Sequence, residues 1–366
     1  MPGKIIFAAV LFLSSQVSPA RSREAEPLTA SQFAGIIQRI SEEGGYFWND
    51  NYVSNEASYL HPLTKLRELG IRGGIYIGVG PNQNFTYIAK LHPRYAFVLD
   101  IRRQNLLEHL LFKALFHLAR DRRDFLSLLL SRPITRGSLT GDSYTVQDMV
   151  RYFQMANPDA SLSRRTLERV HLYLTTNCRV SLSDLDWQTM GKIHQAFFYR
   201  GLSIKYDYIP VPTFGEFLTE RDLEGKMQDF LNSTQDFRYL KRLQEENRII
   251  PIVGDFAGSH ALRELGRYLR ERDERVTVFY TSNVEQYLVR NNAWARFLKN
   301  VGELPLDDRA VFIRAYWSTY ISHPEGVAGY RFTQILQWIK PFLREFNPNL
   351  VYSYWDIVTT NTIKLH

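Results

Sequence analysis

The chain of 366 residues contains a single cysteine, Cys178. One thiol excludes an internal disulfide and can give a metal only one thiolate, so the fold cannot depend on oxidation. The motifs His-Glu-x-x-His, Gly-x-x-x-x-Gly-Lys-Ser/Thr and Gly-x-Ser-x-Gly are missing, and the nine histidines lack metal-ligand spacing. Zinc-enzyme, P-loop and serine-hydrolase functions therefore lack support, and we expect no metal site.

Long apolar runs are missing as well. Residues 5–13 form an apolar run that is too short to span a bilayer. It follows Lys4 and precedes the small residues Ser18-Pro19-Ala20, which is typical of a secretory signal peptide over residues 1–20. We therefore expect a protein exported to the periplasm or the extracellular space, with no transmembrane segment in the mature chain. The alternatives are an uncleaved anchor, or a mis-assigned start codon and a cytoplasmic protein.

The chain also lacks a concentrated basic tract, although its formal net charge is +7. Positive and negative side chains are interleaved, as on an ordinary solvated surface, so there is no strong nucleic-acid signal. The hydrophobic fraction of 45% and the charged fraction of 23% are typical of a folded protein with a sizeable core.

What the chain does contain is a strand, turn, helix and strand over residues 74–105. An apolar strand enters the turn Gly78-x-Gly80, a short helix follows, and a second apolar strand ends at Asp100. Glycines let the backbone bend tightly and approach a ligand, and the helix start offers free N–H groups. A carboxylate 22 positions after the first glycine can accept hydrogen bonds from ribose hydroxyls. The pattern predicts a site for an adenosine-containing ligand; the alternative is a turn without a ligand.

The third glycine of the dinucleotide fingerprint is replaced by Gln83, which favours a smaller nucleoside ligand over NAD. The pattern resembles the first two strands of class I S-adenosylmethionine-dependent methyltransferases, in which the turn lies under the methionine part and the acid holds the ribose. Gly78, Gly80 and Asp100 match those motif positions. The resemblance implies S-adenosylmethionine as the cofactor. The expected cofactor-binding residues are Gly78, Gly80, Asn82, Asn84, Asp100, Arg102 and Glu56.

Alternating strands and helices predict an α/β fold, a Rossmann-like and mostly parallel sheet with helices on both faces. We expect a helix over residues 331–346 and seven strands, the number in the methyltransferase fold. The expected division is an N-terminal lid over 21–73, a first sheet part over 74–132, a helical insertion over 133–201 and a second sheet part over 202–366. The expected strands begin at Gly74, Tyr95, Leu202, Ile249, Arg275, Ala310 and Val351.

Polar residues follow two of these strands, and the carboxyl ends of strands in open α/β sheets face the ligand crevice. The resemblance implies that Asp255, at a fourth-strand position, meets the methyl acceptor, where it could orient an amine or hydroxyl or act as a base. Asn283 and Glu285 follow the next strand and could hold a substrate by hydrogen bonds. We expect these three as the catalytic residues; helix capping is the alternative for each.

Residues 46–56 combine aromatic residues with side-chain amides and end in Glu56, which suits a lid over a ligand. The alternative is a surface turn with its aromatics in the core. Two arginines follow Asp100, where they could pair with it or serve an anion. His109 and Lys113 share one side of an amphipathic helix over residues 105–130, and we expect that side to face solvent.

A second resemblance covers nearly all of the mature chain. The strings DNYVSNE, YIGVGPNQNFTYIA, DIRRQNLLEHLLFKALF, PIVGDFAG and FYTSNVEQYL are similar to those of a family of uncharacterised bacterial proteins. This implies a common fold and site without a named reaction. We expect an S-adenosylmethionine-binding, methyltransferase-like protein of unknown acceptor. The alternatives are an exported, non-catalytic Rossmann-like module that binds a ligand or protein, and an NAD-type oxidoreductase.

Overall fold

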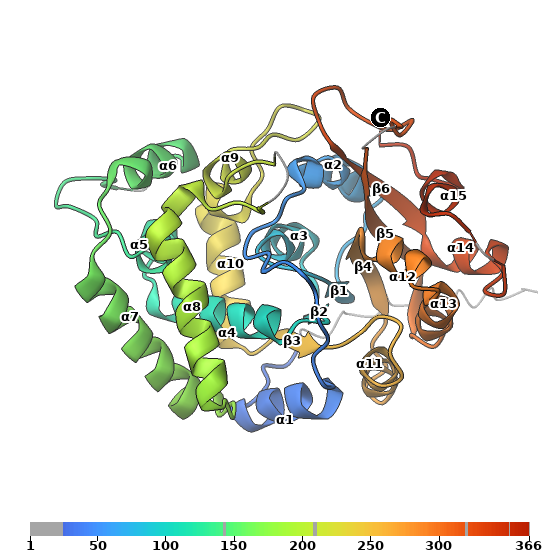
Figure 1. The fold of residues 1–366 in the computed structure, drawn as a ribbon, viewed down its shortest axis with the longest axis horizontal. Coiled ribbons are helices and arrows are strands. Elements are labelled where there is room, and N and C mark those ends of the chain that lie inside the picture. Colours follow the sequence, from blue (N-terminus) through green and yellow to red (C-terminus); the bar gives the residue numbers. More distant parts are fainter. Residues whose placement is uncertain (1–24, 142–143, 208–210, 319–320, 351, 366) are drawn as a thin grey trace, which may run out of the picture.

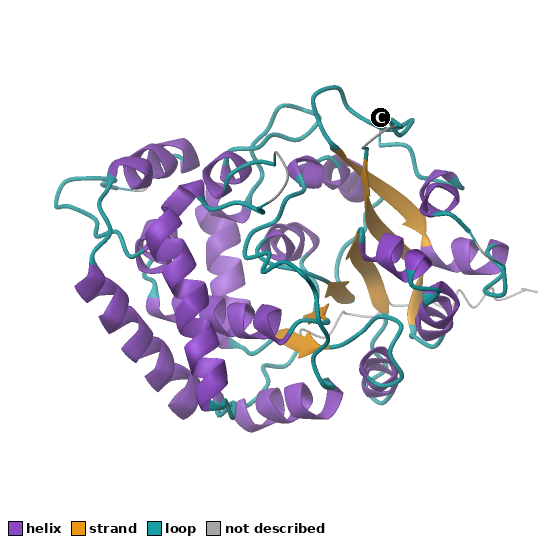
Figure 2. Cartoon of the chain, in the orientation of Figure 1, coloured by secondary structure: helices purple, strands orange, loops and turns teal. Residues whose placement is uncertain are grey.

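The computed structural model describes residues 25–141, 144–207, 211–318, 321–350 and 352–365, and its centre is a six-stranded sheet (Figures 1 and 2). The strand order is β3-β2-β1-β4-β5-β6. The first five strands in this order are parallel, and β6 is antiparallel to β5. The strands are β1 (Ile75–Gly78), β2 (Tyr95–Asp100), β3 (Ile249–Val253), β4 (Val276–Ser282), β5 (Leu306–Trp317) and β6 (Phe332–Trp338).

The central strands are nearly continuous apolar runs. Every residue of β1 and β3 is buried, as expected for parallel strands that helices cover on both faces. Figure 1 shows α3, α4 and α10 on one side of the sheet and α11 and α13 on the other. The α-helices are α1 (Ala30–Ile40), α2 (Pro62–Glu68), α3 (Gln83–Leu91), α4 (Arg103–Leu118), α5 (Arg122–Leu130), α6 (Val146–Met155), α7 (Ala160–Tyr173), α8 (Asp184–Arg200), α9 (Phe214–Leu218), α10 (Thr234–Glu245), α11 (Ala261–Arg270), α12 (Val284–Arg290), α13 (Trp294–Gly302), α14 (Ile339–Glu345) and α15 (Tyr354–Thr359).

Helices α5 to α8 form a layer beside α4, at the far left of Figure 1. A cluster of phenylalanine rings, among them Phe85 of α3, Phe116 of α4 and Phe125 of α5, joins this layer to the sheet domain. Shorter turns of helix connect the larger elements: η1 (Ala57–Leu60), η3 (Gly201–Ser203) and η4 (Phe230–Asn232) are 3-10 helices, and η2 (Leu174–Cys178) is a π-helix.

The expectation of seven strands is wrong. The strand expected from Leu202 is instead the 3-10 turn η3, whose residues pack into the helical layer. The strand expected from Val351 contains helix α15, because Ser353 and Asp356 form a capping box that starts a helix there. The helix expected over 331–346 is strand β6 followed directly by α14.

The long helix expected over 105–130 is two helices, α4 and α5. The second helix begins after Asp121, because the Asp121 side chain accepts a hydrogen bond from the Asp124 N–H and caps the N-terminus of α5. The expected signal peptide at residues 1–20 lies outside the described residues. Within the described part of the chain, no helix has both the length and the apolar character needed to cross a bilayer.

Candidate functional site

A cavity of about 340 Å³ lies at the carboxyl ends of the parallel strands. From β1 the chain moves outward in one direction to β2 and β3, and it then returns to β4 and β5 on the other side of β1. The crevice at such a reversal of strand order is where open α/β sheets bind their ligands. The cavity is lined by residues that follow β1 (Val79, Gly80, Pro81), β2 (Ile101, Arg102), β3 (Gly254, Asp255, Phe256) and β4 (Asn283, Val284), by Asp100, Tyr280 and Ser282 at strand ends, and by Tyr46, Phe47, Asn51, Ser54, Asn55 and Glu56.

The two glycines of the β1 turn have different roles. Gly80 lines the cavity with φ +76°, a conformation that L side chains rarely adopt, and a Cβ there would meet no atom within 4 Å. A ligand can therefore approach this backbone closely. Gly78, in contrast, does not line the cavity. A Cβ on it would stand 2.0 Å from Asn84 Oδ1. Gly78 makes room for a protein side chain, so the expectation that it contacts a cofactor finds no support in its position.

Asn84 stabilises the β1 turn through hydrogen bonds to its backbone. Its Nδ2 donates to the carbonyls of Val79, Gly80 and Pro81 at 3.0, 3.0 and 2.8 Å, and its Oδ1 accepts from the Tyr76 hydroxyl. Asn84 is fully buried and does not line the cavity. Its amide is therefore committed to the turn backbone and not available to a cofactor, contrary to expectation.

Asn82 is also buried outside the cavity lining, where its Oδ1 accepts from the Ser54 N–H and joins the turn to the segment above it. His109 of α4 supports the turn from the other side, with Nε2 2.9 Å from the Gly80 carbonyl oxygen. Burial lowers the pKa of His109 to about 4, so the ring is neutral and Nε2 carries the proton that it donates. Asn82 and His109 thus position the turn and do not meet a ligand.

The expectation that His109 and Lys113 face solvent is wrong. Their exposed fractions are 2% and 1%. Lys113 donates to the Gln244 carbonyl and lies over the Phe33 ring, with Nζ 4.5 Å from the ring centroid. Neighbouring elements bury both groups: His109 lies against the β1 turn and Phe85 of α3, and Lys113 lies between Phe33 of α1 and Gln244 of α10.

Asp100 and Arg102 form a buried ion pair at the end of β2. The Arg102 N–H and Nε donate to Asp100 Oδ1 at 2.9 and 3.0 Å, and Nη2 donates to Oδ2 at 2.8 Å. Oδ1 has thus used both of its lone-pair directions, while Oδ2 has one left. Arg103 points away and binds Asp186 of α8 at 2.6 and 2.7 Å. Of the two interpretations of these arginines, pairing with Asp100 is confirmed for Arg102.

Glu56 lies at the floor of the cavity with 1% of its surface exposed. Its Oε2 accepts from Gln83 Nε2 at 3.1 Å and from Gln334 Nε2 at 2.7 Å, and its Oε1 accepts from the Ser282 hydroxyl. Burial raises the pKa of Glu56, whereas these donors act in the opposite direction. The carboxylate is thus fixed at the reversal of strand order by residues of α3, β4 and β6.

The three expected catalytic residues do not all lie at the cavity. Asp255 and Asn283 line the cavity, whereas Glu285 is absent from its wall. Glu285 is fully buried and paired with Arg314 of β5, whose Nε and Nη2 lie 2.5 and 3.0 Å from the carboxylate. A carboxylate committed in this way stabilises the junction of β4 and β5, so the position of Glu285 gives no support to the expected substrate contact.

Asp255 follows β3, which is an edge strand of the sheet, and not a fourth strand as the comparison with methyltransferases implied. Its Oδ1 accepts from the Ala257 N–H at 2.9 Å, an interaction that shapes the local turn. Its second carboxylate oxygen has no such partner among the described residues, so Asp255 serves both the turn and the cavity wall. Asn283 lies between β4 and α12 and faces the cavity directly.

Sequence analysis missed several residues of this site. Gln334 stands 278 positions from Glu56 in the chain, and only the pairing of β6 with β5 brings the two together. Tyr280 and Arg296 also line the cavity. Their signal was weak, because a tyrosine inside an apolar strand and an arginine on a helix are ordinary core and surface residues.

Two aromatic residues of the 46–56 segment, Tyr46 and Phe47, line the cavity. Phe47 packs edge-on against Tyr287 of α12, with ring centroids 5.5 Å apart, and Tyr46 is 86% exposed. Trp48 packs edge-on against Tyr206, with centroids 6.0 Å apart. Tyr46 and Phe47 thus belong to the cavity wall, whereas Tyr52 and Val53 of the same segment pack into the main core.

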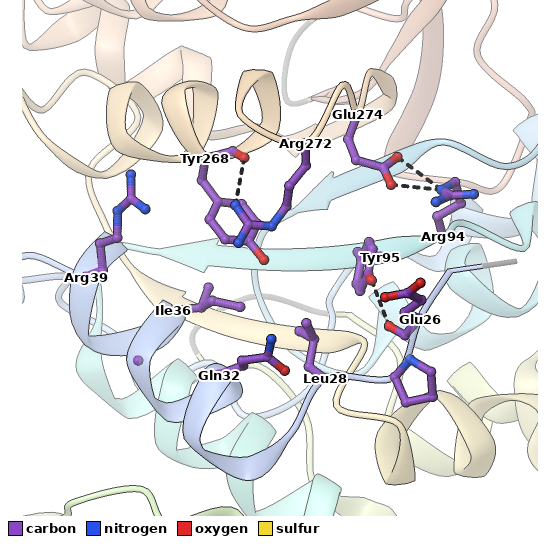
Figure 3. A pocket seen from close by; sticks show the side chains of 12 residues that line it. Glu26, Leu28, Gln32, Ile36, Arg39, Arg94, Tyr95, Tyr268, Arg272 and Glu274 are labelled. Atoms are coloured by element: carbon purple, nitrogen blue, oxygen red, sulfur yellow. Dashed lines mark hydrogen bonds and ion pairs between the residues drawn. The ribbon is translucent and has the colours of Figure 1, made fainter. Parts of the chain in front are cut away.

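A second cavity, of about 460 Å³, lies between α1, α11 and the start of β2 (Figure 3). Two of its arginines have partners within the protein: Arg94 binds Glu274, and the Arg272 guanidinium lies 3.7 Å from the centre of the Tyr268 ring. It opens at the amino ends of the strands, because Tyr95 begins β2. This is the edge opposite to the one at which open α/β sheets bind ligands, so the cavity next to Gly80 is the better candidate.

The chain belongs to a family defined by a domain of unknown function, DUF7790, whose model matches residues 52–173 and 202–354. The matched segments contain the β1 turn, the end of β2, and Gln83, Ser282 and Gln334, which donate hydrogen bonds to Glu56. They leave out residues 174–201, which include α8. No curated protein matches the chain.

Proposed function

We propose that the protein binds S-adenosylmethionine, or a closely related adenosyl compound, in the cavity next to Gly80, and that it is a methyltransferase-like protein. The observation that carries this proposal is that Gly80 and Asp100 line one cavity at the reversal of strand order. The strand order 3-2-1-4-5 with a sixth strand beyond it is that of the Rossmann-like folds, which bind nucleotides at this place.

The volume of the cavity favours one nucleoside over a dinucleotide. About 340 Å³ is close to the lower end of the range for ligand sites, which is roughly 300–1,000 Å³. NAD carries two nucleosides joined by a pyrophosphate and needs a larger site. The side chain of Gln83, which replaces the third glycine of the fingerprint, is turned towards Glu56 and Tyr87. Both features argue against the NAD-type oxidoreductase.

The free lone pair on Asp100 Oδ2 offers one acceptor to a ribose hydroxyl. Open backbone at Gly80 offers room for the remainder of the ligand. On the far wall, Asn283 and the free oxygen of Asp255 are the groups suited to a methyl acceptor. Methyl transfer needs chiefly an in-line arrangement of the nucleophile and the methyl group, so positioning by such groups can account for catalysis.

A second candidate is a non-catalytic binding module with the same fold. The pairing of Asp100 with Arg102 favours it, because the protein's own guanidinium takes most of the acceptor capacity that a ribose would use. Export through the signal at residues 1–20, which we also propose, favours this candidate further. Fractionation of cells that produce the full chain tests the compartment.

Isothermal titration calorimetry of the purified protein with S-adenosylmethionine, S-adenosylhomocysteine and NAD separates these functions. We expect heat from the two adenosyl compounds and none from NAD. The Asn283→Ala variant, which removes a cavity amide, should bind about three- to tenfold more weakly. Tyr95→Phe, in the second cavity, is the matched control and should bind unchanged. No heat with either adenosyl compound refutes the proposal, and binding without methyl transfer to any acceptor supports the module.

A further inference from the structure

Glu56 is a buried carboxylate that has no counter-ion among the described residues. Two acids near it in the described chain do have one: Glu285 pairs with Arg314, and Asp100 pairs with Arg102. In the part of the chain that the structure describes, no cation forms an ion pair with Glu56, and only neutral side chains donate to it. A charge removed from water without a partner is costly, so such a group usually has a function.

Glu108 and Asp229 are among the other buried acids that have no ion pair in the described chain. Neither of them lines the cavity, whereas Glu56 does. Burial raises the pKa of all three carboxyl groups. Asp222, a further buried acid of the described chain without an ion pair, is absent from the cavity lining as well. Of these described acids, only Glu56 is placed where a bound ligand can supply the missing positive charge.

The surroundings of Glu56 are arranged to hold an anion. Gln83 cannot turn its amide away, because its Oε1 accepts from the Ser54 hydroxyl while its Nε2 donates to Glu56. Gln334 is fully buried and directs its Nε2 to the same carboxylate oxygen. Amide donors that are fixed towards a carboxylate favour its charged form.

The backbone at Ser282 has a strained conformation that places the Ser282 hydroxyl next to Glu56. Its φ is +53°, in the left-handed region that residues with a side chain seldom adopt. This conformation, at the last residue of β4, turns the Ser282 hydroxyl onto Glu56 Oε1. Strain of this kind persists where surrounding structure enforces it, and it is concentrated at functional sites.

We propose that Glu56 is the counter-ion for a positively charged group of the bound ligand, a sulfonium or a protonated amine, and that it makes the cavity selective for cationic over neutral nucleosides. This inference rests on the proposed nucleoside site and names the part of the ligand that Glu56 meets. The ligand's cation lies against the floor of the cavity, between the β1 turn and the end of β4.

Calorimetry with three probes tests it. S-Adenosylmethionine carries a sulfonium and an ammonium, S-adenosylhomocysteine only the ammonium, and 5′-methylthioadenosine neither. Glu56→Gln should weaken S-adenosylmethionine binding by about 10- to 100-fold, the range for hydrogen bonds to charged groups, and change 5′-methylthioadenosine binding less than threefold. Loss for S-adenosylmethionine alone identifies the sulfonium as the partner; equal loss for both charged probes identifies the ammonium.

Glu108→Gln is the matched control, since it also neutralises a buried glutamate but one outside the cavity lining. It should leave the preference among the three probes unchanged. If Glu56→Gln fails to fold by circular dichroism, Ser282→Ala replaces it. That variant keeps the carboxylate and removes one donor, and it should reduce the preference for S-adenosylmethionine over 5′-methylthioadenosine severalfold.

Equal weakening of all three probes by Glu56→Gln, or no change in any of them, overturns the counter-ion role while leaving the nucleoside site intact. An unchanged preference in Ser282→Ala, where that variant is the one used, has the same meaning. Failure of the wild-type protein to bind any probe is the separate outcome that refutes the nucleoside site, and the inference with it.

Discussion

Replacing Lys113 by methionine should make the protein more stable at neutral pH. Burial lowers the pKa of Lys113 from its ordinary 10.5 to about 8, and no carboxylate forms an ion pair with it among the described residues. This lowering of the pKa corresponds to about 3 kcal/mol of destabilisation when the amine is charged. Methionine has a similar shape and avoids this cost.

Part of the gain is offset by lost contacts. Lys113 donates to the Gln244 carbonyl and lies over the Phe33 ring, and a net hydrogen bond contributes about 1 kcal/mol. The carbonyl keeps a donor, because the Asn247 N–H also binds it. We therefore expect Lys113→Met to raise the free energy of unfolding by about 2 kcal/mol at pH 7.

The pH dependence gives the sign of the effect. Between pH 8 and 10.5 the unfolded chain holds the Lys113 proton and the folded chain does not, so the stability of the wild-type protein rises with pH across this window. The advantage of Lys113→Met is full below pH 8 and is lost as the pH approaches 10.5. Urea unfolding at pH 7 and pH 10 measures it, with the exposed Lys192→Met as a control that should change stability by less than about 0.5 kcal/mol. A variant that is less stable at pH 7, or an advantage that is the same at both pH values, would refute the reasoning.

Three further predictions concern the residues around the cavity. Gly78→Ala should destabilise the fold by about 2 kcal/mol or more in urea unfolding, because its Cβ would stand 2.0 Å from Asn84 Oδ1; the wild-type stability would contradict this. Glu285→Gln should lower the free energy of unfolding by about 3–5 kcal/mol by leaving Arg314 buried and unpaired, yet ligand affinity measured on the remaining folded protein should stay the same. Asp100→Ala should weaken S-adenosylmethionine binding in calorimetry by about 1–3 kcal/mol, and unchanged affinity would exclude its contact with the ribose.

The central strands could be predicted because they are buried on both faces. Residues 75–78, 95–100 and 249–253 are short apolar runs beside turn residues, and in such runs the local pattern and the tertiary structure agree. The pattern fails at β6 and α14, because this strand passes into the helix at Ile339 without a glycine or proline between them. In the sequence, the apolar residues of β6 have strand spacing and those of α14 have helix spacing. Without a break between them, the two segments are predicted as one continuous helix.

The site could be predicted only where the chemistry is local. Gly80 and Asp100 belong to one βαβ unit, so their spacing alone places them at the same edge of the sheet. The partners of Glu56 and Glu285 come from β4, β5 and β6, and nothing in the sequence near either acid distinguishes a cavity carboxylate from one in a buried ion pair. Long-range packing decides between these two roles.

The three hydrogen bonds from the Asn84 amide to the turn carbonyls have a consequence for recognition. They fix the conformation of the loop beside Gly80 in the unbound protein. Ligand binding therefore does not have to order this stretch of backbone, and the loss of conformational entropy there is small. Empty and occupied forms should therefore superimpose at this loop, and we expect any adjustment on binding at the part of the cavity wall that Tyr46 and Phe47 form.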